Sequence, residues 1–294
     1  MSTRAEEGMR AGFKLKLAMF EDHVVPSSFI PLLSSFKTRE VREGDIFLCT
    51  YPKSGTYWTW EILNMILKGE AKYAEHWMCS TFMDERNEEV LDNIPSPRIL
   101  VTHVIPSNLP TAIWERKCHV INVQRNPKDV AGSYYSHVTN QNWLYKGTEP
   151  SFNGSWENFI DAYIKGNTPH DSVFDHNLSW NKVPEDYPDV PFLQIHYEDL
   201  KKNAVTVVKQ LAEFINHPLP DKVYEEIAEA CRFTKLKHAH KHVKNPTYYN
   251  PWIEGSTGHF RKGETGDWKN WFTVAQSERF DRMYEQKFHR SFPY

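Results

Sequence analysis

The chain has 294 residues, of which 40% are hydrophobic and 25% are charged, and its formal net charge is −3. This length and composition suit one large α/β core or two small ones, and they argue against a disordered or fibrous protein. Because acidic and basic residues are interspersed, the sequence also disfavours a nucleic-acid-binding protein, which usually carries a basic stripe.

The cysteines and the apolar runs indicate the compartment. The four cysteines show no C-x-x-C spacing, which is typical of buried thiols in a reducing compartment rather than zinc ligands or disulfides. No run approaches 18 apolar residues, and the N-terminal stretch has no apolar signal-peptide core. We therefore expect a cytoplasmic protein without a membrane or nucleic-acid partner.

The predicted elements alternate between strands and helices along the chain. Short apolar runs bounded by turn residues predict buried strands at 45–51, 98–103, 118–125 and 191–197. Apolar side chains at helical spacing predict helices at 56–69, 127–138 and 197–216. This order predicts βαβ units and an α/β fold, with a central parallel sheet flanked by helices on both faces. In such a sheet a ligand binds beyond the carboxyl ends of the strands.

A Lys-Ser-Gly-Thr turn joins the first predicted strand to the first predicted helix, within FLCTYPKSGTYW at 47–58. N–H groups and the dipole at a helix start favour a phosphate there. Gly55 allows the backbone to approach the ligand, and Ser54 and Thr56 add hydroxyl groups. Lys53 precedes the glycine, whereas the lysine of a Walker A loop follows it. The stretch predicts a P-loop-like phosphate site, although a bare Lys-Ser-Gly is more often an ordinary surface turn.

Three stretches resemble signatures of the cytosolic, small-molecule sulfotransferases. They are TYPKSGTYW at 50–58, VQRNPKDVAGSYYSH at 123–137 and RKGETGDWKNWFT at 261–273. The resemblance covers roughly residues 35 to 290 and implies a single sulfotransferase domain over residues 1–294. Residues 1–34 are expected to be less ordered or to form an N-terminal part of the acceptor pocket.

The cofactor that the resemblance implies is 3′-phosphoadenosine 5′-phosphosulfate (PAPS), with 3′-phosphoadenosine 5′-phosphate (PAP) as product. Its 5′ end is expected in the loop after the first strand, its adenine on Trp58 and near Tyr197, and its 3′-phosphate on Arg125 and Ser133. The full set of expected cofactor-binding residues is Lys53, Ser54, Gly55, Thr56, Tyr57, Trp58, Arg125, Ser133, Tyr197, Cys231, Arg232, Phe233, Lys235, Leu236, Phe260, Arg261, Lys262 and Gly263.

The resemblance also assigns the chemistry. His103, at the end of the second predicted strand, resembles the catalytic histidine, and its ordinary pKa near neutrality suits a general base. Lys53 is expected to stabilise the charge that develops on the leaving phosphate, and Ser133 to restrain Lys53 before the acceptor binds. The acceptor is expected to be a phenol, alcohol, steroid or amine. Its expected contacts are Phe82, Val101, His103 and His137.

The scheme requires no metal. His238, His240 and His242 stand at alternate positions in KHAHKH (237–242), but no acidic or cysteine ligand stands beside them. A solvated basic loop is therefore the favoured interpretation over a metal site. The stretch at 269–278 matches the family's short dimer motif through Lys269, Thr273, Val274 and Glu278, which implies a homodimer.

Three positions depart from the family pattern. Val101 stands where the family commonly has a lysine that helps to bind the transferring group, Cys231 stands near the adenine where the family often has a threonine, and Tyr57 replaces a threonine of the phosphate loop. These departures keep open a binding protein of the same fold that has lost turnover. A kinase is disfavoured because no predicted strand ends in a magnesium-binding Asp, and a Golgi carbohydrate sulfotransferase because no membrane anchor is seen.

Overall fold

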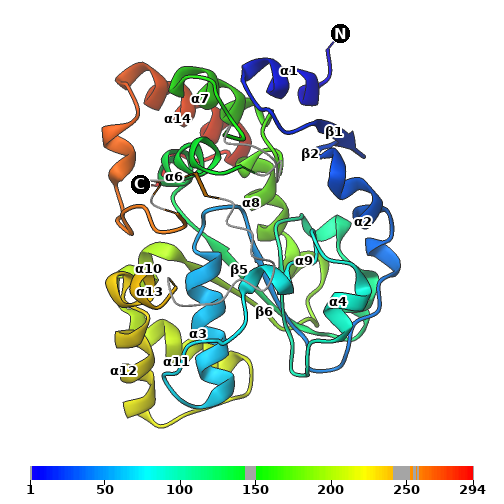
Figure 1. Cartoon of the computed structure of the whole chain (residues 1–294), viewed down its shortest axis with the longest axis vertical. Coiled ribbons are helices and arrows are strands. Elements are labelled where there is room, and N and C mark those ends of the chain that lie inside the picture. Colours follow the sequence, from blue (N-terminus) through cyan, green and yellow to red (C-terminus); the bar gives the residue numbers. More distant parts are fainter. Residues whose placement is uncertain (1, 143–149, 241–251, 254–255, 257, 294) are drawn as a thin grey trace. The chain divides into compact units, whose positions relative to one another are not determined.

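The computed structural model describes residues 2–142, 150–240, 252–253, 256 and 258–293. The contacts within the chain divide it into two compact units, each assembled from segments that are far apart in sequence (Figure 1). Unit 1 combines residues 1–31, 126–181 and 249–294, and unit 2 combines residues 32–125 and 182–248. The single domain expected over residues 1–294 stays a prediction.

Unit 2 is built on a four-stranded parallel sheet in the order β4-β3-β5-β6. Every strand lies within a range predicted from the sequence, and all side chains of β3 and β4 are buried, as expected for covered strands. The predicted α/β fold with a central parallel sheet flanked by helices is therefore confirmed. The strands are β3 (Ile46–Thr50), β4 (Ile99–Thr102), β5 (His119–Gln124) and β6 (Phe192–His196).

Helix α3 (Thr56–Lys68) follows β3 and packs against β3 and β4. It begins after Gly55 and ends before Gly69, and both glycines have left-handed backbone conformations. Helices α11 (Ala204–Phe214) and α12 (Asp221–Ala230) pack against α3 (Figure 1). Their buried side chains join those of the sheet in one apolar core. The other elements wholly in unit 2 are η2 (Phe36–Thr38), η3 (Met78–Thr81), α4 (Glu88–Asp92), η4 (Pro106–Asn108), α5 (Thr111–Glu115), α9 (Val183–Asp186), α10 (Tyr197–Lys202) and α13 (Phe233–His240).

The continuous helix predicted over 197–216 is wrong at one residue. Asn203 has φ −149° and ψ 70°, and it separates α10 from α11. Its N–H still donates to the carbonyl oxygen of Asp199 at 2.8 Å, so the break leaves this amide paired. Apolar spacing alone does not reveal the break, because Leu200 in α10 and Val207 in α11 are buried on either side of it.

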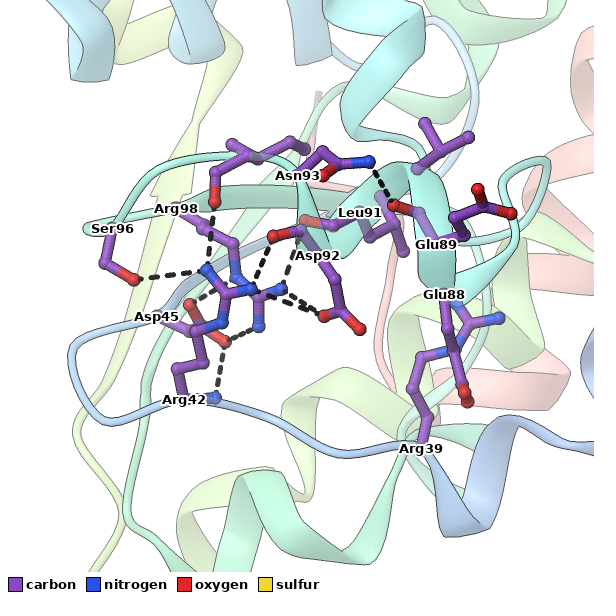
Figure 2. A network of polar contacts seen from close by, with 12 residues as sticks. Arg39, Arg42, Asp45, Glu88, Glu89, Leu91, Asp92, Asn93, Ser96 and Arg98 are labelled. Atoms are coloured by element: carbon purple, nitrogen blue, oxygen red, sulfur yellow. Dashed lines mark hydrogen bonds and ion pairs between the residues drawn. The ribbon is translucent and has the colours of Figure 1, made fainter.

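The amino-terminal end of the sheet is held by a network of ion pairs and hydrogen bonds (Figure 2). Asp45 and Arg98, which precede β3 and β4, are 0% and 2% exposed and meet through two contacts of 2.5 and 2.8 Å. Arg98 also donates to the carbonyl oxygen of Leu91 and the carboxylate of Asp92, both at 3.2 Å. Arg42 donates its backbone N–H to Asp45 at 2.8 Å. Two strand starts and α4 are thereby joined by satisfied, buried charges.

In unit 1, helix α6 (Pro127–Asn140) begins with the proline predicted at its first turn, and the Asn126 side chain caps it by accepting from Lys128 N–H. The ammonium group of Lys128 is buried, where it contacts Asp281 at 2.6 Å and Ser277 at 2.8 Å, and so fixes α6 to α14 (Val274–Phe288). The other elements wholly in unit 1 are α1 (Arg4–Ala11), β1 (Leu17–Phe20), β2 (His23–Pro26), η1 (Ser27–Phe29), α7 (Trp156–Lys165), α8 (Val173–Asn181) and η5 (Asp267–Asn270).

The N-terminal segment contains regular structure. After α1, strands β1 and β2 form an antiparallel pair, and α2 (Ile30–Ser34) begins in unit 1 and ends in unit 2. The suggested part of residues 1–34 in an acceptor pocket stays a prediction.

Candidate active site

Four residues of the predicted site follow the carboxyl ends of the four strands in unit 2. Lys53 comes after β3, His103 after β4, Arg125 after β5 and Tyr197 after β6. Because the strands are parallel, their carboxyl ends meet at one edge of the sheet, where α/β proteins bind ligands. The four residues therefore lie at the edge where the sequence placed them, and their roles stay predictions.

The loop between β3 and α3 passes very close to Tyr197. Gly55 has φ 109°, and a Cβ atom at this position would lie 2.9 Å from Cδ2 of Tyr197. Lys53 also adopts a left-handed conformation, with φ 70°, which is uncommon for a residue other than glycine. Among the residues described, no side chain caps the start of α3. Its first turn therefore keeps the N–H groups and partial positive charge that favour an anion.

Arg125 contacts the backbone of this loop. Its Nη1 donates to the carbonyl oxygen of Lys53 at 3.1 Å, and its guanidinium carbon lies 4.1 Å from the centre of the Tyr197 ring. Trp58 meets the same Tyr197 ring edge-on at 5.4 Å. These contacts stabilise the left-handed peptide at Lys53, which the sequence did not predict. The contact of Arg125 with a 3′-phosphate stays a prediction.

The ring of His103 is held in one tautomer. Its Nδ1 lies 2.7 Å from the backbone carbonyl oxygen of Thr50. A carbonyl oxygen only accepts, so Nδ1 carries the proton and Nε2 carries the lone pair. Burial lowers the pKa of His103 to about 4, partly opposed by the Thr50 hydrogen bond, and the positive charge of Lys53 lowers it as well. The ring is thus neutral at neutral pH, with a pKa below the near-neutral value expected from sequence.

Two threonine hydroxyls connect the phosphate loop with this histidine. Thr56 Oγ1 lies 2.7 Å from Thr50 Oγ1, which lies 3.2 Å from His103 Nδ1. Thr50 was not predicted as a site residue, because in sequence it is only the last residue of a strand. Its position turns a strand end into a direct contact between the loop and His103.

Asp84 is a second residue that the sequence did not single out. It is 1% exposed, and its two carboxylate oxygens accept from the Thr102 hydroxyl at 2.5 Å and from the backbone N–H of His103 at 2.7 Å. Burial raises the pKa of Asp84 to about 7, against both hydrogen bonds. In sequence Asp84 resembles its neighbour Glu85, and only the pairing of residues 82–83 with β4 brings it to His103.

Phe82 and Val101, both expected to contact the acceptor, lie beside this arrangement in unit 2. The Phe82 ring is 5.0 Å from the His103 ring. Val101 is fully buried in β4 and belongs to the apolar core, and its carbonyl oxygen accepts from Met83 N–H at 2.9 Å. This chain therefore fills with core material the position at which the family commonly has a lysine. Their contacts with an acceptor stay predictions.

Tyr57 lies in the first turn of α3, and Cys231 contacts the same helix near its C-terminal end. The Tyr57 ring meets the His240 ring edge-on at 4.8 Å, and burial raises the pKa of Tyr57. Cys231 is a buried core thiol 3.7 Å from Sδ of Met65, and burial raises its pKa.

The charged members of the stretch 231–236 are exposed. Arg232 and Lys235 pair with Glu229 at 3.2 and 2.9 Å. The cofactor contacts expected here, including those of Phe233 and Leu236 on α13, stay predictions.

In unit 1, Ser133 and His137 lie one turn apart on α6. The His137 ring is 5.2 Å from the ring of Trp252 and 6.2 Å from that of His259. Neither Trp252 nor His259 was predicted as a site residue. Their part in binding, like that of Ser133 and His137, stays a prediction.

The second and third signature stretches are joined within unit 1. The Asp129 carboxylate accepts backbone N–H groups of Gly266 at 2.7 Å and Trp268 at 2.9 Å. A Cβ atom on Gly132 would lie 2.9 Å from the Trp271 ring. Residues of the second signature therefore pack against and hydrogen-bond to residues of the third signature.

Asp267 gathers the cations of the third signature. Arg261 Nη1 and Lys262 Nζ lie 2.5 and 2.7 Å from its carboxylate oxygens, and Asn270 and Trp271 donate to it as well. Although burial opposes this, the hydrogen bonds hold the pKa of Asp267 below its usual range. The expected contacts of these two cations and of Gly263 with a 3′-phosphate, and that of Phe260 with the cofactor, stay predictions.

The predicted dimer segment, residues 269–278, lies in unit 1 and includes the first residues of α14. Thr273 caps this helix by accepting from Gln276 N–H at 3.2 Å, and Val274 is 76% exposed. The homodimer stays a prediction.

Among the described helices none is long and apolar enough to span a membrane. Within the same residues no cluster of His, Cys, Asp or Glu is arranged to hold a metal. His242 of the KHAHKH stretch lies outside the described residues.

Comparison with known proteins extends these observations over most of the chain. The family model described as the sulfotransferase domain matches residues 43–292. Dog sulfotransferase 1B1 is 36% identical over 259 residues, which cover 84% of this chain and 84% of that protein. Human sulfotransferase 1C2 is 31% identical over 287 residues, with 94% of each chain covered. The crystal structure of mouse sulfotransferase SULT7A1 complexed with PAP is 28% identical, has a TM-score of 0.73, and covers 94% of this chain and 96% of that one.

Proposed function

Since this chain belongs to the sulfotransferase domain family, we propose that it transfers a sulfuryl group from 3′-phosphoadenosine 5′-phosphosulfate to a small acceptor. The relative crystallised with PAP supports this choice of donor. The observation that carries the proposal is the tautomer of His103, whose Nε2 carries the lone pair at the sheet edge where the Lys-Ser-Gly-Thr loop also begins.

The residues of the loop fit the 5′ end of such a donor. Gly55 lets the loop pass close to Tyr197, where a Cβ atom would lie 2.9 Å from the ring, and the start of α3 has no side-chain cap among the described residues. The buried indole N–H of Trp58 has no acceptor within the described part of the chain. When bound, the phosphosulfate supplies an activated sulfuryl group whose bridging oxygen leaves with the nucleotide. Lys53, Gly55 and Thr56 would hold its 5′ end, and Trp58 its adenine.

His103 acts as the general base in this proposal. Nε2 accepts the proton of the acceptor hydroxyl as the acceptor oxygen bonds to sulfur. The hydrogen bond from Nδ1 to Thr50 keeps Nε2 unprotonated and stabilises the imidazolium that forms. An anion bound in the loop would also raise the pKa of His103 from about 4, because nearby negative charge favours the protonated ring. A bound donor thus strengthens the base that uses it.

Lys53 supplies the charge stabilisation. Its positive charge already lowers the pKa of His103, so the two groups are close enough to interact electrostatically. An ammonium group there stabilises the negative charge that accumulates on the leaving phosphate. Arg125 supports it by holding the carbonyl oxygen of Lys53.

The 3′-phosphate is assigned by resemblance to Arg125 and Ser133 and to Arg261, Lys262 and Gly263. Arg and Lys side chains are suited to bind phosphate oxygens. The pairing of Arg261 and Lys262 with Asp267 keeps both cations on one carboxylate. Acceptor class is proposed only as a phenol, alcohol, steroid or amine, with Phe82 and His137 among its contacts. The protein is proposed to be cytoplasmic and to pair as a homodimer through 269–278.

A binding protein without turnover is the second candidate, and Val101 is the observation that favours it. The position is apolar and fully buried, so the lysine charge common in the family is missing. The base, the loop lysine and the loop glycine are nevertheless all present, which favours the enzyme.

The test is transfer of radiolabelled sulfuryl from the phosphosulfate to a panel of phenols, alcohols, steroids and amines. PAP binding is measured in parallel by calorimetry. Label transfer to any acceptor class supports the enzyme. Tight PAP binding without transfer to any acceptor would favour the binding protein instead. Preferential binding of ATP with magnesium would contradict both.

A further inference from the structure

The buried carboxylate of Asp84 lies directly behind the proposed base. Its Oδ1 accepts the Thr102 hydroxyl at 2.5 Å, and its Oδ2 accepts the backbone N–H of His103 at 2.7 Å. The Thr102 hydroxyl oxygen in turn accepts the backbone N–H of Val104 at 3.2 Å. One carboxylate therefore organises three consecutive residues at the point where β4 ends.

We propose that Asp84 is a positioning residue for the transfer reaction: its carboxylate fixes the backbone of Thr102 and His103 and so aims Nε2 of His103. This inference rests on the proposed function for its effect on turnover, but its structural part concerns the free protein. Asp84 touches neither donor nor acceptor in this proposal and acts through His103 alone.

His103 is held at two points by groups from different segments of the chain. Its backbone N–H is fixed by Asp84, and its ring Nδ1 is fixed by the Thr50 carbonyl oxygen at the end of β3, at 2.7 Å. The Phe82 ring packs 5.0 Å from the imidazole. With the backbone and one ring nitrogen both fixed, few side-chain rotamers remain, and the direction of Nε2 is set.

The segment that carries Asp84 is itself anchored to β4. Met83 N–H donates to the Val101 carbonyl oxygen at 2.9 Å, and the Met83 carbonyl oxygen accepts from Arg39 Nη1 at 3.1 Å. The residue before Asp84 is therefore fixed through both its N–H and its carbonyl oxygen. Such a supporting shell is what keeps a catalytic group within the narrow range of productive geometry.

The two contacts suit an ionised carboxylate. Oδ1 accepts the Thr102 hydroxyl and Oδ2 accepts the His103 N–H, whereas an asparagine would present one oxygen and an NH2 group that can only donate. Burial opposes this ionisation and raises the pKa of Asp84 to about 7. The groups that influence or sense it are Arg39, whose charge favours ionisation, Glu85, which opposes it, the Cys49 thiol, whose pKa Asp84 raises, and His103. A buried carboxylate kept at this position despite its desolvation is more typical of a functional site than of simple packing.

The test compares Asp84→Asn with Asp84→Glu and with Thr102→Val, which removes one of the two contacts. We expect Asp84→Asn to lower kcat about tenfold or more while changing PAP affinity by less than about twofold, because misorienting a base impairs the chemical step and leaves donor binding intact. Asp84→Glu, which keeps both acceptors, is expected to recover part of the loss. Thr102→Val is expected to show a smaller loss in the same direction.

Two readouts separate positioning from a purely structural role. In wild type, the amide proton of His103 is expected to shift in NMR spectra as Asp84 titrates near pH 7, and this titration should vanish in Asp84→Asn. We also expect the pH profile of the wild-type kcat to show an inflection near neutral pH, and this inflection should be absent in Asp84→Asn. If Asp84→Asn does not fold, the wild-type amide titration and Thr102→Val decide the question.

The proposal is overturned if Asp84→Asn melts at a lower temperature but keeps the wild-type kcat, or if the His103 amide does not titrate with Asp84. If wild type transfers no label at all, the proposed function fails, whereas the NMR titration still tests the clamp on His103. The two failures are therefore distinguishable.

Discussion

The two ends of the parallel sheet in unit 2 use buried charge for different purposes. At the amino-terminal end, Arg98 and Asp45 form a bidentate pair, and further hydrogen bonds to α4 surround it. At the carboxyl-terminal end, the carboxylate of Asp84 forms no such ion pair with the residues that the structure describes, and its two oxygens accept from Thr102 and His103 instead. Satisfied charges at one end stabilise strand starts, whereas the buried carboxylate at the other end contacts the backbone of the proposed base.

The largest stability effect is expected at the amino-terminal end. Arg98→Met leaves the Asp45 carboxylate buried without its partner, which should lower the free energy of unfolding by about 3–5 kcal/mol. The kcat of the folded protein should stay unchanged. Urea unfolding measures the first quantity, and a sulfuryl-transfer assay the second.

The matched control is Arg116→Met, which breaks an exposed pair with Glu40 and should change stability by about 1 kcal/mol or less. If Arg98→Met were as stable as this control, or folded fully but lost turnover, the division of labour between the two ends would be wrong.

Two left-handed glycines sharpen the comparison further. Gly44, at the amino-terminal end, has φ 82° and no atom of the described residues within 4 Å of an added Cβ, whereas a Cβ on Gly55 meets Tyr197 at 2.9 Å. Substitution by alanine should strain either backbone by about 1–3 kcal/mol. Only Gly55→Ala should also weaken PAP binding, measured by calorimetry. Equal PAP affinity of the two variants would contradict the proposal that the loop containing Gly55 binds PAP.

A smaller effect is expected on the pKa of His103 in the free protein. The pKa is about 4 and is lowered by burial and by the charge of Lys53. Lys53→Met should therefore raise it, and Lys117→Met, an exposed lysine at the other end, should not. NMR titration of the imidazole measures both variants. An unchanged pKa of His103 in Lys53→Met would show that Lys53 does not influence His103 electrostatically.

The lowered pKa of His103 also determines how folding stability depends on pH. His103 has a folded-state pKa below its unfolded value of 6.5, so the stability it contributes is present above about pH 6.5 and is lost as the pH falls toward 4. Asp84 acts in the opposite sense, because its folded-state pKa of about 7 exceeds the ordinary 3.8. Its contribution to stability decreases as the pH rises between these two values.

Val274→Glu, in unit 1, is expected to have the smallest effect on the stability and activity that depend on the sheet in unit 2. A charge on this exposed valine should convert a dimer into a monomer in analytical ultracentrifugation, while the melting temperature stays nearly constant. A wild-type protein that is already monomeric would contradict the dimer prediction.

Much of the fold and part of the site follow from the sequence. Continuous apolar runs located all four strands of the sheet within a residue or so at each end, and the loop lysine, His103, Arg125 and Tyr197 all follow strand ends. Asp84 and Thr50 could not be found in this way, because their importance depends on contacts across strands that no local pattern encodes. The break at Asn203 was also missed, since buried residues continue on both sides of it.

The most direct test of the account is the rate of sulfuryl transfer by His103→Ala beside its affinity for PAP. If Nε2 of His103 is the base, transfer should fall by about 10²–10⁴-fold, the range typical for loss of a general base, while PAP affinity changes by no more than about twofold. Transfer at the wild-type rate by His103→Ala would contradict the account.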